Sequence, residues 1–353
     1  MKILLFFGLA VLFTGCAKET IFAVSSADNS AGGVYAISEK TAVCTIPLPR
    51  SSYIVHYKDK LYVTSNAARK SADRSGFLNT IDAETLNILH QMPVNGITPC
   101  HLTVAPDGKF VYTVNYSSGN LSEIPLDNGI PCPPGRLIQH SGSSVNLRRQ
   151  KSAHPHFSGF DPQGKQLFVC DLGTDEIWIY NYIPGKGVEL PCVEKLKLPP
   201  GSGPRHLAFA PDGNTIYVAN ELSSCAASFH KVENRWTLVK NISSRSGKSF
   251  SQKNFPGAIK ITSDGKFFFI TNRGDDTIAV FKTSAGGDFK LIGNVDSQGQ
   301  YPSDILLDEV NETLWTINMK NGTAAKFKMN LTAGDLEAVP EKIMVPRGIS
   351  LSK

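Results

Sequence analysis

The most constraining feature of this chain is a pattern that recurs along most of its 353 residues. In each unit a proline opens a short apolar run, a turn follows, and a second apolar run ends on Asn or Asp. The prolines, which lie 44 to 56 residues apart, are Pro99, Pro155, Pro204, Pro256, Pro302 and Pro346. A repeat of about 40 to 50 residues built from short strands is typical of a β-propeller. The chain is therefore predicted to be all-β.

Each unit contains a tight turn between its two apolar runs. Ala105-Pro-Asp-Gly-Lys109 precedes the run that ends at Asn115, and Asp-Gly recurs in the same place at Asp212 and Asp264. Asp-Gly between apolar runs predicts a β-hairpin, because the turn needs a positive φ that Gly adopts at little cost. The β-branched and aromatic run after the turn predicts a strand buried on both faces. The run that the proline opens is named strand a, and the run after the turn strand b.

The two ends of the chain supply the parts of one further unit. Complete units start near residues 51, 99, 155, 204, 256 and 302, the first without its proline. Pro346 opens a strand a that no strand b follows, while residues 21–25 and 33–38 have the character of strands b and c. We therefore predict a seven-bladed propeller whose last blade is closed by N- and C-terminal strands, which removes the open sheet edges. Residues 17–353 are predicted to form this single domain.

Residues 1–16 are predicted to be an export signal. Lys2 precedes an apolar stretch that is too short to span a bilayer as a stable helix, and Thr14-Gly15-Cys16 is similar to a lipoprotein cleavage site. Cys16 would then carry a lipid anchor, whereas cleavage near Ala17 would release a secreted protein. Both alternatives place the mature protein outside the cytoplasm, without a membrane span.

Charge and cysteine content narrow the classes of partner. The net charge is +5 at pH 7, and the basic residues are scattered apart from the run Arg148-Arg149-Gln-Lys151. Nucleic-acid binding would need a denser basic stripe, so nucleic acid is not an expected partner. We expect a small-molecule partner instead, and a protein that is a monomer or a weak dimer. Six cysteines follow Cys16, and their pairing stays open. The sequence has no Cys-X-X-Cys or Cys/His metal-ligand spacing, so neither a metal nor another cofactor is expected.

In a propeller, strand a starts and strand b ends at the same face, beside the central channel. The residue after each opening proline and the residue after each strand b are therefore predicted to converge there. The first set is Cys100, His156, Arg205, Gly257, Ser303 and Arg347. The second set is Tyr116, Leu172, Glu221, Arg273 and Met319. The members that carry ionisable groups on three consecutive blades are His156, Arg205, Glu221 and Arg273.

This constellation suits acid–base chemistry on an anionic substrate. Glu221 or His156 would take a proton from water or protonate a leaving oxygen. Arg205 and Arg273 would hold a carboxylate or phosphate, or stabilise an oxyanion. Further substrate contacts are predicted for His101, His154, His206 and Arg347. The alternative is structural, namely an ordinary buried ion pair between Glu221 and one of the two arginines.

Two metal hypotheses are less favoured. His154-Pro-His156 has the composition of a ligand pair, but the intervening proline makes shared ligation awkward. The residues that end each strand b would form a ring of side-chain oxygens, an arrangement by which Ca²⁺ can be bound. They are Asn115, Asp171, Asn220, Asn272 and Asn318. Asn and Asp are also common turn residues after a strand, and we favour that interpretation.

Several motifs, in this order, resemble the seven-bladed lactonase family, which contains bacterial 6-phosphogluconolactonase and fungal 3-carboxy-cis,cis-muconate lactonizing enzyme. The motifs are Pro99-Cys-His-Leu, Val114-Asn-Tyr-Ser-Ser-Gly119, Arg149-Gln-Lys-Ser-Ala-His-Pro-His156, Val169-Cys-Asp-Leu-Gly-Thr-Asp175, Gly203-Pro-Arg-His-Leu, Ala219-Asn-Glu-Leu222 and Thr271-Asn-Arg-Gly274. The likeness covers about residues 20 to 350. It implies active-site residues at His156, Arg205, Glu221 and Arg273, the same four that convergence selects.

The chain departs from the family pattern on one side of the channel. Ala258-Ile-Lys260 lacks the acidic residue and the His common in relatives, and Asp275 stands where a His is common. The sixth unit opens Pro302-Ser303-Asp304 where relatives have Pro-Arg, and its strand b ends Asn318-Met319 where they have Asn-Gln. The identity of the substrate is therefore not carried over from the resemblance.

These observations together predict an exported, metal-free lactonase acting on the lactone of an anionic sugar acid or related carboxylate. Glu221 would activate water against the lactone carbonyl, and His156 would pass the proton to the ring oxygen. Arg205 and Arg273 would hold the anion and the developing oxyanion. Three alternatives stay open: a propeller that binds a ligand or partner without turnover, a Ca²⁺-dependent lactonase, and a cycloisomerase that forms a lactone.

Overall fold

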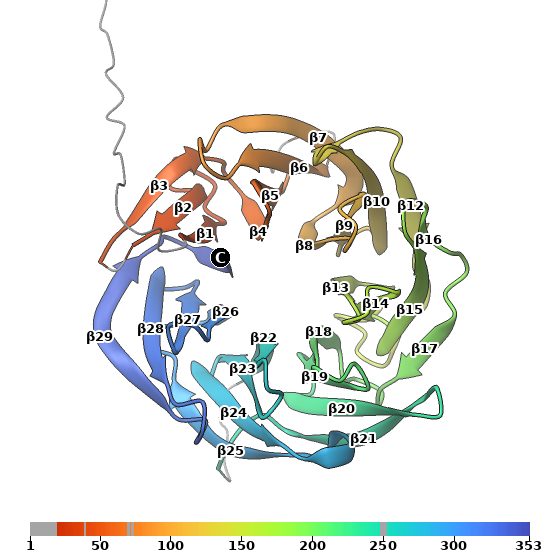
Figure 1. The fold of residues 1–353 in the computed structure, drawn as a ribbon, viewed down its shortest axis with the longest axis vertical. Helices are drawn as coiled ribbons and strands as arrows, with labels where there is room; N and C mark the ends of the chain where they lie inside the picture. Colours follow the sequence, from red (N-terminus) through yellow and green to blue (C-terminus); the bar gives the residue numbers. More distant parts are fainter. Residues whose placement is uncertain (1–19, 39, 69–70, 72–73, 248–252) are drawn as a thin grey trace, which may run out of the picture.

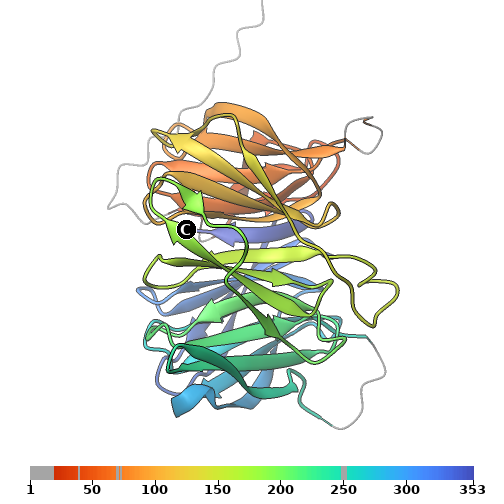
Figure 2. The ribbon, with the colours of Figure 1, turned by 90° about the vertical axis from the view of Figure 1, so that its right-hand side faces the viewer.

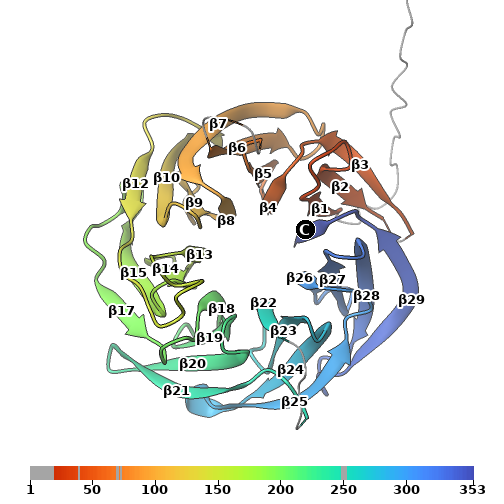
Figure 3. The same cartoon turned by 180° about the vertical axis from the view of Figure 1, so that it is seen from behind.

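A computed structural model describes residues 20–38, 40–68, 71, 74–247 and 253–353. The predicted signal segment, with Cys16, lies outside the described residues. The described chain forms seven antiparallel sheets arranged in a ring like the blades of a propeller (Figure 1). Figure 2 shows the ring from its side, and Figure 3 shows the same order of sheets from behind. The predicted fold class is confirmed.

The first three blades are numbered by the order of their strand a. Blade 1 comprises β4 (Ser51–Tyr57), β5 (Lys60–Ser65), β6 (Ser75–Asp82) and β7 (Ile88–Ile97). Blade 2 comprises β8 (Pro99–Val104), β9 (Phe110–Asn115), β10 (Asn120–Asp127), β11 (Ile130–Pro131) and β12 (Arg136–Gln139). Blade 3 comprises β13 (Pro155–Phe160), β14 (Gln166–Asp171), β15 (Glu176–Ile183), β16 (Gly187–Val188) and β17 (Glu194–Lys197). In blades 2 and 3 the outermost strand is thus split into two short pieces.

The remaining blades have four strands each. Blade 4 comprises β18 (Pro204–Phe209), β19 (Thr215–Asn220), β20 (Cys225–Val232) and β21 (Arg235–Ser243). Blade 5 comprises β22 (Phe255–Ile261), β23 (Phe267–Arg273), β24 (Thr277–Thr283) and β25 (Phe289–Asp296). Blade 6 comprises β26 (Pro302–Asp308), β27 (Thr313–Asn318), β28 (Thr323–Met329) and β29 (Leu336–Met344). Blade 7 comprises β30 (Gly348–Ser352), β1 (Ile21–Ser25), β2 (Gly33–Ile37) and β3 (Ala42–Pro47).

Blade 7 closes the ring with both ends of the chain. β30 pairs antiparallel with β1, which pairs with β2 and so on outward. The C-terminal strand is therefore the innermost strand of a blade whose other strands come from the N-terminus, as Figure 1 shows. This confirms the predicted closure.

Strand b is the buried centre of the blades. Every residue of β5, β19 and β27 is buried. Neighbouring blades bury their apolar faces against each other, as where Phe168 of blade 3 packs with Leu207 of blade 4. Each large apolar side chain buried in this way contributes about 1.5–3 kcal/mol. The packed ring fixes the ends of strands a and b around the channel.

Within the described residues, the single helical element is a short 3₁₀ turn, η1 (Ala285–Gly287). That same part of the chain contains no helix with the length and apolar character needed to cross a bilayer.

Candidate active site

The start of strand a is distorted in every blade. The register shifts after its first residues, so that strand a has one residue more than strand b at this point. In six blades the extra residue is single and lines one central cavity: Ser52, Cys100, His156, Arg205, Ser303 and Ile349. A β-bulge of this kind redirects a side chain next to a functional site. The bulges therefore explain why the residues after the opening prolines converge.

A backbone hydrogen bond fixes the residue that follows strand b. In six blades its N–H donates to the carbonyl of the residue before strand a. Gly203 accepts from Glu221 in this way, at 2.8 Å. Gly203 has a φ of 63°, and a Cβ there would lie 2.4 Å from the side chain of Leu222. This turn, which holds Glu221 beside the channel, therefore requires glycine.

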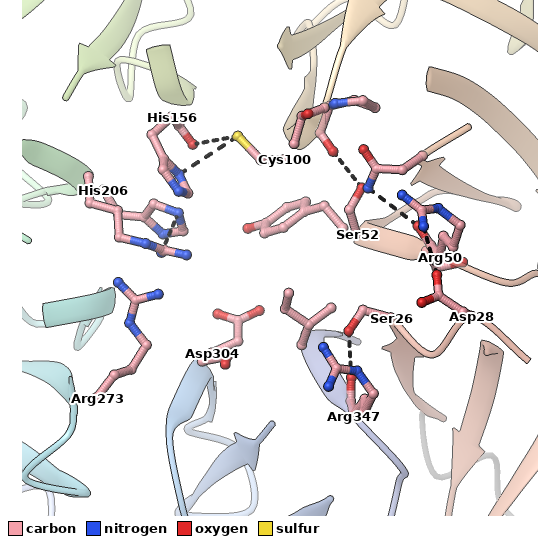
Figure 4. Close-up of a pocket in the computed structure, with 18 residues that line it drawn as sticks. Ser26, Asp28, Arg50, Ser52, Cys100, His156, His206, Arg273, Asp304 and Arg347 are labelled. Atoms are coloured by element: carbon pink, nitrogen blue, oxygen red, sulfur yellow. Dashed lines mark hydrogen bonds and ion pairs between the residues drawn. The ribbon is translucent and has the colours of Figure 1, made fainter. Parts of the chain in front are cut away.

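The cavity at the centre of the ring has a volume of about 320 Å³. Figure 4 shows His156, His206 and Arg273 on one side of it and Arg50 and Arg347 on the other. Small-molecule sites are typically concave cavities of about 300–1,000 Å³ with a few convergent polar groups. The size and the lining of this cavity suit a small anionic ligand.

Three arginines converge on the carboxylate of Glu221. Arg149 Nη2 lies 2.7 Å from Oε1, and Arg273 Nη2 lies 2.6 Å from Oε2. Arg205 Nε lies 3.1 Å from Oε2, in an ion pair without hydrogen-bond alignment. Burial raises the pKa of Glu221, but the charges of Arg273 and Arg205 outweigh it and hold the pKa well below its ordinary value. The ion pair considered as the structural alternative is therefore present, and Glu221 is a fixed anion.

The position of Glu221 bears on its chemistry. The residue is buried, and it is not one of the described residues that line the cavity. Both carboxylate oxygens already contact guanidinium groups. A proton on either oxygen would have to disrupt these ion pairs. Glu221 is thus better suited to hold the arginines than to accept a proton.

His156 faces the cavity from blade 3 (Figure 4). Its Nδ1 lies 3.8 Å from Cys100 Sγ, and its ring packs edge-on against Tyr116. Desolvation lowers the pKa of His156 well below 6.5, and the charge of Arg205 acts in the same direction. The imidazole is therefore neutral near pH 7 and able to accept a proton. Burial raises the pKa of the Cys100 thiol to about 12, so this thiol stays protonated.

Arg205 and Arg273 bring two cations to the cavity wall, and both are buried. Arg273 donates to the carbonyl of Phe255 at 2.9 Å, and its guanidinium lies 5.2 Å from the ring centre of Tyr301. Arg205 Nη1 donates to His206 Nε2 at 2.9 Å. Burial, with the charge of Arg273, lowers the pKa of Arg205 to about 10, which leaves it charged at neutral pH. Such fixed cations suit an anion or a developing oxyanion.

Two of the predicted substrate contacts lie elsewhere. His101 is buried between the rings of Tyr53 and Phe157. His154 stacks on Tyr116, and its Nδ1 lies 2.8 Å from the Tyr116 carbonyl oxygen. Neither histidine is among the described residues of the cavity lining. The structure therefore does not bring them to the site, whereas His206 and Arg347 both line it.

Arg347 lines the cavity for a different reason from the one expected. The Pro-Arg motif placed it in the same set as Arg205, but the bulge residue of blade 7 is Ile349. The carbonyl of Arg347 accepts the N–H of Ser26 at 3.1 Å, as that of Gly203 accepts from Glu221. Arg347 is therefore the residue before strand a, and it has a left-handed φ of 48°. This corrects the sequence-based register of the last strand.

Two charged groups at the candidate site escaped the sequence-based selection. Arg149 lies in the irregular segment between blades 2 and 3. The available signal was that Arg149 is the first residue of the motif that ends with His154-Pro-His156. Asp304, at the altered start of blade 6, lines the cavity and accepts from Ser350 Oγ and Leu351 N, both at 2.9 Å. Burial raises the pKa of Asp304. The cavity therefore contains a carboxyl group as well as cations.

The ring of Asn and Asp side chains serves the turns. Asn115 donates to Asn120 and Ser122. Asp171 accepts from the backbone N–H of His154, of residue 173 and of residue 174. Among the described residues, no group of three His, Cys, Asp or Glu side chains has an arrangement that could hold a metal ion. The turn interpretation accounts for these contacts.

Comparisons with known proteins agree with this geometry. Residues 17–352 match the family described as Lactonase, 7-bladed beta-propeller. The chain belongs to this family. It is 30% identical over 265 residues to the 6-phosphogluconolactonase of Bacillus subtilis, covering 74% of each chain. It is 28% identical over 276 residues to that of Formosa agariphila, covering 76% of this chain and 78% of the relative.

A solved structure has the same fold. A protein from Lactobacillus plantarum superposes with a TM-score of 0.85 at 27% identity, covering 94% of this chain and 98% of the other. The predictions of the family and of a lactonase as the class of enzyme are confirmed.

Proposed function

We propose that this lactonase hydrolyses the lactone of an anionic sugar acid or related carboxylate in the central cavity. The observation that carries the proposal is a neutral His156 beside two buried arginines that a common carboxylate fixes. An acid–base group next to preorganised cations is what acyl transfer to water requires. The cavity volume of about 320 Å³ limits the substrate to a small molecule.

In the proposed reaction, His156 accepts a proton from a water molecule as the water oxygen bonds to the lactone carbonyl carbon. The carbonyl oxygen becomes an oxyanion, which Arg205 and Arg273 stabilise. The bond from the carbonyl carbon to the ring oxygen then breaks, and His156 returns the proton to that oxygen. The product is the open hydroxy acid, whose carboxyl group loses its remaining proton to solvent, and the carboxylate stays next to the arginines until release.

Glu221 has a positioning role in this proposal. The sequence alone suggested that Glu221 activates the water, but its contacts with Arg149, Arg205 and Arg273 favour His156 for that step. Glu221 neutralises part of the charge of the arginines and fixes their directions. Fixed charges cost no reorganisation when the oxyanion forms.

The cavity and the relatives support the proposed substrate class. Arg347 adds positive charge to the side opposite His156, where Arg50 is paired with Asp28 at 2.7 Å. A second anionic group of the substrate would lie towards this side. The 6-phosphogluconolactonases of Bacillus subtilis and Formosa agariphila support a phosphorylated sugar lactone as the first substrate to test. Ring closure uses the same residues in reverse, so the residues present allow either direction.

The test is hydrolysis of a lactone panel by residues 20–353, with phosphorylated, carboxylated and uncharged members, each with and without a chelator. We expect turnover of an anionic member that survives the chelator and falls steeply in His156→Gln. Loss of turnover with the chelator and recovery with Ca²⁺ would support the Ca²⁺-dependent alternative. A folded protein that binds an anionic member without turning over any would contradict hydrolysis and support a binding propeller.

We also propose that residues 1–16 direct export. The basic Lys2, the short apolar stretch and Cys16 support this assignment. The mass of the mature N-terminus after expression in a bacterium with an intact export pathway tests it. A lipid-modified Cys16 would indicate an anchored lipoprotein, an unmodified N-terminus near Ala17 would indicate secretion, and an uncleaved chain in the cytoplasm would refute export.

A further inference from the structure

We propose that Asp175 is a positioning residue that couples the two segments carrying Arg149 and Glu221. Asp175 is buried in the turn between β14 and β15, and it is not one of the described residues that line the cavity. The inference rests on the proposed function, because it concerns how the Glu221 centre is held.

Four hydrogen-bond donors converge on the Asp175 carboxylate. Oδ1 accepts from Gln150 Nε2 at 2.7 Å and from Gly203 N at 2.6 Å. Oδ2 accepts from Ser144 Oγ at 2.5 Å and from Gly201 N at 2.7 Å. Two donors belong to residues 140–154, between blades 2 and 3, and two belong to the loop before β18. One buried carboxylate thus joins two loops that come from different blades.

Both of these loops lead to Glu221. Arg149 is the chain neighbour of Gln150, and its guanidinium lies 2.7 Å from Glu221 Oε1. On the other side, the Gly203 carbonyl accepts the N–H of Glu221 at 2.8 Å. Asp175 is thus connected to Glu221 on two sides. One connection runs through Gln150 and Arg149, and the other runs through Gly203. A shift of either loop would therefore move groups against which Arg205 and Arg273 are aligned.

The Arg149 segment depends on side chains for its shape. It has no regular secondary structure between residues 140 and 154. Gln150 is fully buried, and its Nε2 also donates to the Leu172 carbonyl at 2.9 Å. Its Oε1 accepts from Asn146 N at 3.1 Å. Because an Asn amide replaces one acceptor oxygen by a donor, Asp175→Asn would confront at least one of the four donors with another donor.

The chain offers a matched control in blade 5. Asp276 lies in the corresponding turn between β23 and β24, with the same φ of 57° as Asp175. Its Oδ1 accepts from Tyr301 N at 2.8 Å, the counterpart of the bond from Gly203 N. Among the hydrogen bonds of the described residues, none joins Asp276 to the segment of Arg149. Asp276→Asn therefore removes the charge, keeps an oxygen that can accept from Tyr301 N, and leaves the Arg149 segment in place.

A double-mutant cycle measures the coupling. We expect Asp175→Asn to lower kcat/KM on the lactone that the wild type turns over by about 10- to 100-fold, mainly through kcat, as expected for misplaced catalytic groups. In an Arg149→Met background the same change should have a much smaller effect. Asp276→Asn should act equally in both backgrounds. Equal losses from Asp175→Asn in both backgrounds would overturn the coupling and leave only a stabilising role.

Hydrogen exchange provides a readout that does not depend on turnover. In Asp175→Asn the amides of residues 142–152 and 201–203 should exchange faster, whereas in Asp276→Asn they should remain as in the wild type. Unchanged exchange in Asp175→Asn would refute the positioning role, whatever the activity. A wild type without lactonase activity would refute the proposed function instead, so the two failures are distinguishable.

Discussion

The central cavity has two sides that differ in how their charges are held. On the side of blades 4 and 5, Arg205 and Arg273 are buried and fixed on Glu221. On the opposite side Arg347 is exposed, and the pair of Arg50 with Asp28 has 24% and 48% of its side chains exposed. Fixed, desolvated charges stabilise a transition state effectively, whereas exposed charges attract weakly and are screened by salt. We infer that the first side performs the chemistry and the second selects the substrate.

The largest effect should follow removal of the proposed base. In His156→Gln the side chain can still form hydrogen bonds, but it cannot take a proton from water. We expect kcat to fall by about 10²–10⁴-fold, the usual contribution of a general base. Steady-state kinetics with an unchanged thermal midpoint would establish the effect. A decrease of less than tenfold in kcat would show that a group other than His156 is the base.

Glu221→Gln should damage stability as well as activity, because it leaves Arg149, Arg205 and Arg273 without their common anion. Breaking a buried ion pair by removing one partner costs about 3–5 kcal/mol. Denaturant unfolding measures this loss. Glu176→Gln, which removes the partner of Lys195 at 3.7 Å on the outer part of blade 3, serves as a control. A similar loss of unfolding free energy in both variants would show that Glu221 stabilises the fold no more than an ion pair on the outer part of a blade does.

Acid should destabilise the fold through its buried histidines. Burial holds the pKa values of His101, His156 and His206 well below 6.5 in the folded state. Below pH 6.5 the unfolded chain therefore binds protons that the folded chain does not, and stability falls with decreasing pH. The slope should reach about 1.4 kcal/mol per pH unit for each histidine. Unfolding free energies between pH 7.5 and 5 measure this slope, and it should be shallower in His101→Phe. An unchanged slope in that variant would show that buried histidines are not the cause of the acid sensitivity.

The smallest effect is expected on the exposed side. Arg347→Gln should raise KM for an anionic lactone by roughly two- to fivefold, as expected for an exposed charge, and leave kcat nearly unchanged. The increase should shrink in high salt. An uncharged lactone provides the control, because its KM should not change. A loss in kcat instead would place Arg347 with the chemistry and would remove the distinction between the two sides.

The repeat made the architecture predictable. The regular prolines and the Asp-Gly turns defined the blades, and the unmatched ends of the chain predicted the closure by β1 and β30. Strand geometry also predicted that His156, Arg205, Glu221 and Arg273 come close together, since equivalent ends of the blades meet around one axis, and their catalytic roles stay a prediction. Periodic, local signals were sufficient for these features.

The features that were missed depend on long-range contacts. Arg149 reaches Glu221 because Asp175 and Leu172 hold its segment, and no spacing in the sequence encodes those bonds. Ion pairing gave Glu221 a low pKa, which its position in a motif did not indicate. His101 was expected to contact substrate because it adjoins Cys100, but the sequence does not show that rings from the neighbouring blades 1 and 3 enclose it. It packs among aromatic rings instead.

The most direct test of this account is the pH dependence of kcat/KM for a turned-over lactone in the wild type and in Glu221→Gln. We predict that activity in the wild type falls only well below pH 6.5, because His156 must be neutral. In Glu221→Gln the residual activity should keep this acidic limb and shift it to lower pH, since the negative charge of Glu221 raises the pKa of His156. Disappearance of the limb in Glu221→Gln would show that Glu221 is the base and would contradict the account.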